Sequence, residues 1–427
     1  MAFLRSFKME KTILHIDMNN FFASVECIDK PELGSVPLAV CGDEKQRHGI
    51  VLAKNELAKK YGIKTGMVLW EARQKCPELV CVGAHMDNYI KYSKLARQLY
   101  YNYTDQIEPF GIDECWLDVT GSAGLFGSGE DIAERIRNEV KDMGLTVSIG
   151  VSFNKIFAKL GSDYKKPDAV TVFSKSNYRD MIWPLDVGDM MFVGRATGKK
   201  LRMLGINTIG DLALTPAGVL ESKLGKMGKV LWSYANGYDD SPVLNTEDSV
   251  PIKSIGNSTT TPRDLETDYD VKTVLYSLSD TVATRMRDQG FRCGAVEIWI
   301  RRSDMESFVR QHKLEYPTCL TNTVAREAFS LFLQNYDWNL PIRGVGVRVS
   351  GLTPLSSNYQ LDMFADETKN AGKENLAFSI DTLRKKYGYS AVLAGIAISD
   401  NSLKALSPED CRRNGAGMYE LTPQLGR

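Results

Sequence analysis

The chain has 427 residues, with 53 basic and 53 acidic side chains and 43% hydrophobic residues. This composition indicates a globular protein of about two to four domains, and because no apolar run approaches the ~20 residues of a membrane-spanning helix, we expect no membrane partner. The eight cysteines form no CxxC pair, which argues against a zinc site or a disulfide framework, and the zero net charge counts mildly against a nucleic-acid binder, although charge can segregate to one face.

The first predicted elements are a strand and a helix. Residues 13–17 (ILHID) are predicted to form a short strand, and a helix follows from about Asn20, with Asn19 or Asn20 as its N-cap. A region interrupted by Gly and Pro then runs to about Pro77, with one helix at 55–62.

The next part of the chain alternates between helices and strands. Helices are predicted at 88–106, 129–144 and 154–167, and strands at 106–112, 115–120, 145–153 and 168–173. The order strand-helix-strand-strand-helix-strand resembles a ferredoxin-like motif with one long insertion after the first strand–helix unit.

The second half of the chain reads as two further domains and a tail. Short helices with Gly turns are predicted from about 175 to 240, and the stretch PVLNTEDSVP that follows is typical of a linker. Beyond it the sequence predicts strands at 293–302 and 344–352, helices at about 271–289 and 321–335, and one more candidate helix at 374–395 in a polar tail. The chain is therefore expected to be an α+β multidomain protein.

Two adjacent acids, Asp113 and Glu114, interrupt a stretch that otherwise reads as buried strand. Because neighbouring side chains of a strand point to opposite faces, two adjacent acids reach one site most easily at the tip of a hairpin. Turns attract acids for other reasons too, so these two residues alone leave both interpretations open. Asp17 favours the functional one, because it ends an apolar strand and the first and third strands of a ferredoxin-like sheet are neighbours.

Three carboxylates at adjacent strand ends would form a hard-oxygen pocket suited to Mg²⁺. Such pockets support two-metal phosphoryl transfer, in which one ion activates a primer 3′-hydroxyl and the other holds the triphosphate and its leaving pyrophosphate. Asp118, further along the second hairpin strand, is interpreted as solvated.

Four motifs in chain order resemble the Y-family DNA polymerases, the translesion enzymes. The segments HIDMNNFFASVE and GIDECWLDVTG, which begin at His15 and Gly111, resemble the two catalytic signatures of that family. Residues 147–173 resemble the palm segment that follows them, and KSIGNSTTT (253–261) resembles the start of the little-finger domain. The resemblance covers about residues 11–355 and extends to bacterial members of the family.

This resemblance implies a right-hand polymerase with a ferredoxin-like palm, small fingers, a helical thumb with a helix-hairpin-helix, and a C-terminal α/β little-finger domain. It implies template-directed addition of deoxynucleotides to a primer 3′-hydroxyl, bypass of damaged bases, and low fidelity and processivity. The implied boundaries are 1–28 and 78–174 for the palm, 29–77 for the fingers, 175–243 for the thumb, 244–252 for the linker, 253–353 for the little finger and 354–427 for the tail.

The resemblance also assigns roles in the reaction. Asp17, Asp113 and Glu114 are implied to be the catalytic and metal-binding acids, and the Met18 carbonyl a further metal ligand. The implied cofactor is a pair of Mg²⁺ ions, for which Mn²⁺ can substitute.

The nucleotide is expected to lie on the first helix. Phe22 matches the steric gate, a ring that leaves no room for a 2′-hydroxyl; helix packing is the alternative for both phenylalanines, and we favour it for Phe21. The backbone amides of Asn20, Phe21 and Phe22 at a helix N-terminus are candidates for holding phosphates, and Lys166 matches the lysine that contacts the triphosphate.

The fingers depart from the family pattern. Many relatives have a Tyr and an Arg that contact the triphosphate where this chain has Glu56 and Lys59. Lys59 keeps the charge but loses the bidentate fork of Arg, and Glu56 would repel phosphate if it pointed inward. Lys54 is a candidate for compensating this loss.

Two regions are expected to hold DNA. Residues 192–213 resemble a helix-hairpin-helix, whose turn amides bind phosphates without reading sequence; a helical bundle with an exposed basic face is the alternative. In the third region, only alternate residues of a strand can point toward the duplex, so Arg301 and Arg302 cannot both touch it. The predicted DNA contacts are Gly194, Lys199, Lys200, Gly205, Arg301 and Arg310.

The tail contains a short segment that resembles the clamp-binding peptide of bacterial polymerases. Its anchors are Gln360, Leu361, Met363 and Phe364, within 360–364; packing on the chain's own domain is the alternative. The expected partners are therefore a sliding clamp, primer–template DNA and deoxynucleoside triphosphates, and we expect a monomer that acts in the cytoplasm at the nucleoid.

Two other classes of function were weighed against a polymerase. A DNA- and clamp-binding accessory protein with weak catalysis is compatible with the altered Glu56 and Lys59, but the three intact acids argue against it. A nucleotidyl cyclase also uses acids at a hairpin of a palm-like sheet, yet it has no use for the helix-hairpin-helix and clamp motifs.

Overall fold

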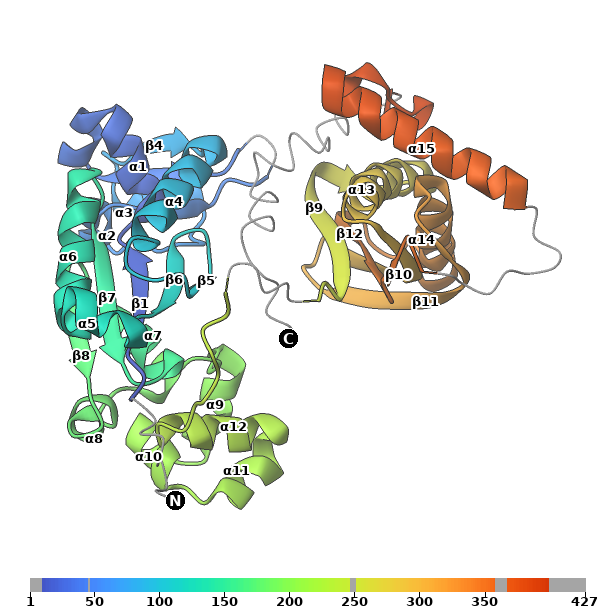
Figure 1. The fold of residues 1–427 in the computed structure, drawn as a ribbon. Coiled ribbons are helices and arrows are strands. Elements are labelled where there is room, and N and C mark those ends of the chain that lie inside the picture. The colour runs from blue at the N-terminus through green and yellow to red at the C-terminus, as the bar shows by residue number, and fades with distance from the viewer. Residues whose placement is uncertain (1–9, 45–46, 246–250, 358–366, 399–427) are drawn as a thin grey trace.

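The computed structural model describes residues 10–44, 47–245, 251–357 and 367–398 (Figure 1). Both segments that resemble catalytic signatures lie in one five-stranded sheet with the order β5-β6-β1-β7-β8. The central strands β6, β1 and β7 are antiparallel neighbours, and β8 pairs parallel with β7 at the edge. The predicted ferredoxin-like arrangement is thus confirmed, with one strand added. The strands are β1 (Ile13–Met18), β5 (Ile107–Pro109), β6 (Glu114–Asp118), β7 (Val147–Ser152) and β8 (Val170–Phe173).

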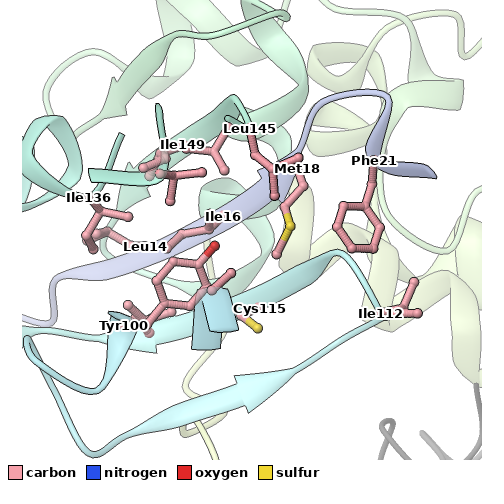
Figure 2. Packing of buried hydrophobic residues seen from close by; sticks show 14 of the residues in the cluster. Leu14, Ile16, Met18, Phe21, Tyr100, Ile112, Cys115, Ile136, Leu145 and Ile149 are labelled. Atoms are coloured by element: carbon pink, nitrogen blue, oxygen red, sulfur yellow. The ribbon is translucent and has the colours of Figure 1, made fainter. Parts of the chain in front are cut away.

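The two faces of this sheet have different partners, because side chains alternate along a strand. Leu14, Ile16 and Met18 of β1 point into a buried hydrophobic core (Figure 2). That core is covered by α1 (Phe21–Asp29), α4 (Met86–Tyr100) and α6 (Gly129–Asp142). His15 and Asp17 point to the opposite face, against which α7 (Lys155–Tyr164) packs.

Two glycines allow α7 to lie unusually close to the sheet. A Cβ added to Gly150 of β7 would stand 1.9 Å from the carbonyl oxygen of Ala158 and 2.5 Å from the amide nitrogen of Ser162. On the helix side, a Cβ on Gly161 would stand 2.9 Å from the Gly150 Cα. Any larger residue at Gly150 would therefore push α7 away from β7, and the side chains of α7 would no longer reach β1.

The insertion after α1 and the segment after β8 form two smaller units. The insertion is a three-stranded sheet in the order β3-β2-β4 with short helices, and the later segment is entirely helical apart from its turns. The elements of the insertion are β2 (Leu38–Cys41), β3 (Val51–Lys54), α2 (Glu56–Lys60), α3 (Leu69–Lys75) and β4 (Val80–Gly83). The elements of the helical segment are α8 (Tyr178–Ile182), α9 (Arg195–Met203), α10 (Ile209–Leu214), α11 (Ala217–Leu224) and α12 (Lys226–Ala235). One further short helix, α5 (Ala123–Phe126), follows β6 of the first sheet.

The third region is a second sheet with the order β11-β10-β12-β9, to which β13 adds by pairing with β10. The two long helices predicted from the sequence, α13 and α14, cover the face of the sheet that carries Val296, Ile298 and Ile300. The elements are β9 (Ser254–Leu265), α13 (Asp268–Asp288), β10 (Phe291–Arg302), β11 (Ser307–Thr318), α14 (Thr321–Asn335), β12 (Ile342–Ser350) and β13 (Thr353–Pro354).

The tail contributes one long helix, α15 (Glu367–Tyr387), which overlaps the helix predicted at 374–395. α15 docks on α13 through ion pairs that are closed to solvent. Asp381 lies 2.6 Å from the Nε of Arg287, and the two side chains are 5% and 2% exposed. Arg384 contacts Asp280 of α13 at 2.9 Å. These contacts join α15 to the same folded unit as α13.

Candidate active site

Asp17 and Glu114 lie directly opposite each other, because β1 and β6 pair in the register Asp17↔Glu114. Glu114 is the first residue of β6, while Asp113 stays in the turn before it, and its carbonyl accepts a hydrogen bond from the Met18 amide at 3.1 Å. The predicted hairpin therefore exists, but its turn is residues 110–113 rather than 113–114. The β1–β6 pairing brings all three acids to one end of the sheet.

Two lysines, one on α7 and one just after it, bind these acids. The Lys159 Nζ lies 3.1 Å from Asp17 Oδ2 and 3.1 Å from Glu114 Oε1. The Lys166 Nζ lies 2.7 Å from Asp17 Oδ2 and 2.7 Å from Asp163 Oδ1. Burial opposes a charged lysine, but the surrounding carboxylates hold the pKa of both lysines above the usual value. Both ammonium groups are thus fixed as cations at the centre of the site.

Lys159 was not predicted as a site residue. It lies on α7, four positions after Lys155 and four before Asp163, and this i,i+4 spacing was the only sequence signal that these side chains share one helix face. The partner of this helix face is set by the close packing of α7 on β7, which cannot be predicted from the sequence of α7 alone.

Asp113 differs from the other two acids in its protonation. Burial, followed by the charges of Asp17 and Glu114, raises the pKa of Asp113 to about 7. A carboxyl in this condition is ready to gain a positive neighbour, because a cation would relieve both the repulsion and the desolvation.

The donor set fits a hard divalent cation. Asp17 and Glu114 already present carboxylate oxygens to a common positive charge, that of Lys159, and oxygens of this kind are the ligands that Mg²⁺ takes. Within the described ranges, however, no three His, Cys, Asp or Glu side chains are arranged around one point as a metal cage. In this structure the oxygens of Asp17 and Glu114 instead contact the ammonium group of Lys159.

Phe21 and Phe22, the adjacent phenylalanines of α1, lie in two different environments. Phe21 is buried in the core at 3% exposure, whereas Phe22 is only partly buried and packs at its edge. The ring of Phe22 stacks on Tyr89 of α4, whose hydroxyl donates to Glu26 at 2.5 Å. Glu26 also contacts the Nδ1 of His85 at 2.9 Å. Tyr89 was missed by the sequence reading, because nothing in α4 marks which of its tyrosines meets α1.

The N-cap of α1 is Asn20, one of the two residues predicted for that position. Asn20 occupies the N-cap position with a positive φ of 50°, but its side chain does not cap the helix. The side-chain amide of Asn20 instead donates to Glu56 Oε1 at 3.1 Å. The first-turn amides of Phe21 and Phe22 have no intrahelical acceptor, as at any helix start.

Two neighbouring side chains bind the carboxylate of Glu56. Besides the bond from Asn20, its Oε1 lies 3.5 Å from the Nζ of Lys59. Burial, followed by the charge of Lys59, lowers the pKa of Lys54, and Lys166 contributes in the same direction. Lys54, Lys59 and Lys166 therefore belong to one basic group beside the three acids.

The predicted thumb contacts are solvent-accessible. Lys199 and Lys200 are exposed on α9, and Gly205 follows that helix with a positive φ of 79°. Gly194 is the N-cap residue of α9. Two residues earlier, Phe192 has a φ of 69° and is 51% exposed, a conformation that normally calls for glycine.

The predicted little-finger contacts Arg301 and Arg310 lie on opposite faces of the second sheet. Arg301 pairs with Gly344 and belongs to the face that the helices leave open, beside Trp299. Arg310 pairs with Ile298, on the covered side, and donates to Asn335 of α14 at 2.9 Å. The two arginines therefore point to different faces of the sheet, because their positions differ in strand parity, and their contacts with DNA stay predictions. Arg302 is paired with Asp304 and Glu306.

The polypeptide that leaves the helical segment is anchored beneath the first sheet. The Lys155 Nζ lies 2.6 Å from both carboxylate oxygens of Glu108, and the Leu244 amide donates to Glu108 Oε2 at 2.8 Å. Val243 packs there against Ile13 and Trp116. The expected linker at 244–252 thus begins at a fixed point on the first sheet.

The candidate clamp-binding residues Gln360, Leu361, Met363 and Phe364 lie outside the described residues. Across the ranges that are described, no helix combines the length and the hydropathy that a bilayer span requires.

Family models match the chain in three places. The model described as "impB/mucB/samB family" matches residues 16–163, and the one described as the C-terminal domain of that family matches residues 252–363. A model described as "DNA polymerase-iota, thumb domain" matches residues 192–239. These matches cover the strand acids, the helical segment and the second sheet.

Individual proteins are similar over most of the chain. A protein named DNA polymerase IV from Acetivibrio thermocellus is 47% identical over 399 residues, which is 93% of this chain and 100% of the relative. DNA polymerase IV of Clostridium acetobutylicum is 38% identical over 400 residues, 91% of this chain and 99% of the relative. Among solved structures, a Y-family DNA polymerase chimera is similar with a TM-score of 0.72 at 25% identity, covering 80% of this chain and 99% of that chain.

Proposed function

This chain belongs to the impB/mucB/samB family of Y-family DNA polymerases, and we propose that it is a template-directed DNA polymerase of the translesion type. The observation that carries this proposal is the pairing of Asp17 with Glu114, which brings three acids together beside a basic group. Carboxylates next to lysines are what phosphoryl transfer from a triphosphate requires. An accessory protein or a nucleotidyl cyclase is not favoured, since the similar full-length proteins are named DNA polymerases.

The family implies a divalent metal cofactor, and we propose two Mg²⁺ ions, with Mn²⁺ as a substitute. Asp17, Asp113 and Glu114 would hold them together with the Met18 carbonyl. When bound, such ions activate the primer 3′-hydroxyl and neutralise the developing charge on the phosphates. Lys159, which now lies between Asp17 and Glu114, would have to give up at least one of these contacts if the same oxygens held a metal ion.

The incoming nucleotide is proposed to lie between α1 and the basic group. Lys166, Lys59 and Lys54 supply positive charge for the triphosphate, and the first-turn amides of α1, from Asn20 to Phe22, supply donors. Phe22 is the proposed steric gate, since it stands at the edge of the core with a rigid ring beneath it. Because Asn20 and Lys59 already bind Glu56, its carboxylate is partly neutralised and its repulsion of phosphate is reduced.

Primer–template DNA is proposed to contact the helical segment and the open face of the second sheet. Gly194, Gly205, Lys199 and Lys200 would hold backbone phosphates, and Arg301 would do so from the sheet. A direct contact from Arg310 would need the duplex to wrap around the edge strand. We further propose that residues 360–364 bind a sliding clamp. The protein would act as a monomer, in the cytoplasm at the nucleoid.

Primer extension tests this function. Wild type would be given a primed undamaged template, all four deoxynucleotides and Mg²⁺, beside Asp113→Asn and Glu114→Gln. We expect short, template-dependent products from wild type and none from either variant. Asp118→Asn is the matched control, because Asp118 lies at the far end of β6 and binds Thr120; it should extend primers as wild type does. Wild type that binds DNA but fails to extend it would overturn the proposal in favour of the accessory role.

A further inference from the structure

A buried histidine lies directly behind Glu114. His15 is fully buried in β1, opposite Trp116 of β6, with the rings of Trp116 and Phe110 against its edges. Its Nε2 lies 3.4 Å from Glu114 Oε2, the oxygen that Lys159 does not bind. Its Nδ1 lies 2.9 Å from the Ser162 hydroxyl of α7. The imidazole thus lies between a catalytic carboxylate of β6 and helix α7, which packs on the same face of the sheet.

The proton positions in this chain of contacts decide what it can do. The Ser162 hydroxyl has one proton and is 2.7 Å from the Lys159 carbonyl and 2.9 Å from His15 Nδ1. If it donates to the carbonyl, Nδ1 must carry the imidazole proton, and a neutral ring then turns a bare Nε2 toward a carboxylate oxygen. If it donates to Nδ1, the ring proton is on Nε2 and points at Glu114.

The second arrangement satisfies more of the buried polar groups. Among the described residues, His15 Nε2 and Glu114 Oε2 are both buried without a hydrogen-bond partner, and a charged acceptor is the costliest group to leave so. The Lys159 carbonyl, by contrast, lies inside α7 and can accept the helical bond from the amide four residues on. The Lys159 carbonyl therefore keeps a partner without the Ser162 hydroxyl. Pairing His15 Nε2–H with Glu114 Oε2 gives a partner to both of these buried atoms.

We propose that His15 is a positioning residue for Glu114, with its Nε2–H donating to Glu114 Oε2 while the Ser162 hydroxyl donates to Nδ1. Holding Oε2 from behind turns Oε1 toward the metal side, where Lys159 now lies. Gly150 and Gly161 make this possible, because only their close contact brings Ser162 within reach of β1. Partners behind a ligating carboxylate fix its orientation in this way at many metal sites. The inference rests on the proposed polymerase function.

Direct metal binding tests the inference without turnover. Mn²⁺ binding would be followed by electron paramagnetic resonance in the complex with dideoxy-terminated primer–template and an incoming nucleotide. His15→Phe keeps the volume and the ring packing but removes the donor, and we expect Mn²⁺ affinity to fall by about 10-fold. His15→Gln places an N–H near the Nε2 position and should stay closer to wild type than to the Phe variant. Ser162→Ala should lose part of the affinity.

Ser152→Ala is the matched control, since Ser152 is a buried serine that donates to the Phe173 carbonyl at 2.8 Å, away from the acids. It should bind Mn²⁺ as wild type does. Wild-type affinity in His15→Phe, or an equal loss in His15→Phe and His15→Gln, would overturn the inference. If neither His15 variant folds, unchanged affinity in Ser162→Ala would do so. Primer extension by wild type, measured beside these assays, shows separately whether the proposed function holds.

Discussion

The rings of Phe22 and Tyr89 are stacked with their centroids 4.2 Å apart and their planes within 9° of parallel. Tyr89 is fully buried and its hydroxyl is bonded to Glu26, so it forms a fixed surface under the more exposed ring. A steric gate works only if the ring cannot move away from a 2′-hydroxyl. The stack therefore gives the proposed gate the rigidity that exclusion by clash requires.

Replacing Tyr89 should weaken sugar discrimination. Tyr89→Leu removes the stacked ring, and because an aromatic pair is worth about 1 kcal/mol beyond burial, we expect the preference for deoxynucleotides over ribonucleotides to fall by about 3- to 10-fold. Tyr89→Phe keeps the ring and should keep most of the preference. Tyr92→Leu, on the same helix but without a contact to Phe22 among the recorded ring pairs, is the control. The measurement is the incorporation efficiency with deoxynucleotides and with ribonucleotides. An equal ratio of the two efficiencies in Tyr89→Leu and wild type would show that Tyr89 does not support the gate.

Asp113 should make the chelator-treated protein less stable as pH rises. The pKa of Asp113 in the folded protein, about 7, lies above the ordinary value of about 3.9 for an aspartate. The stability that this group contributes is therefore complete below about pH 4 and is lost as pH rises through about 7, by roughly 4 kcal/mol in all. Asp113→Asn should flatten this part of the pH profile. Urea unfolding from pH 4 to 8 in a chelator would measure it, and an unchanged slope in the variant would speak against the assignment.

Removing the charge of Glu56 should improve nucleotide binding. Glu56→Gln can still accept from Asn20 but no longer places a carboxylate beside the basic group. Since the side chain is partly exposed, the gain should be modest, about 0.5–1 kcal/mol, which lowers the KM for the incoming nucleotide by about 2- to 5-fold with little change in kcat. Glu71→Gln, an equally exposed acid in an ion pair with Lys75, is the control. An unchanged or higher KM in Glu56→Gln would show that its charge does not reach the triphosphate.

The docking of α15 should stabilise the third region. Asp381→Ala leaves Arg287 buried without its charge partner, and breaking a buried pair costs about 3–5 kcal/mol. Lys385→Ala removes only an exposed pair with Asp288 and should cost at most about 1 kcal/mol. Thermal unfolding of the full chain would compare them. If the two variants lost the same stability, α15 would not be an integral part of that unit.

The sequence by itself determined the α+β class, the strand that ends near Asp17, and the hairpin turn that holds Asp113, but it placed Glu114 in that turn, whereas Glu114 begins β6. These follow from local rules: alternation along a strand, turn residues between apolar runs, and motifs whose members lie within a few residues of each other. The structure buries Phe21 and leaves Phe22 partly exposed, and the steric-gate role of Phe22 stays a prediction. A polymerase family could be named from the same short segments.

Only the tertiary structure decided what stands around the acids. Lys159 meets Asp17 across 142 residues of sequence, and His15 meets Ser162 across 147. Both contacts depend on how closely α7 packs on the sheet, which is set by Gly150 and Gly161 together rather than by either segment. The stacking of Tyr89 under Phe22 depends in the same way on how α4 packs against α1, and the faces of Arg301 and Arg310 depend on the register between β10 and its neighbours. A local pattern states which way a side chain points, but its partner depends on which element packs there.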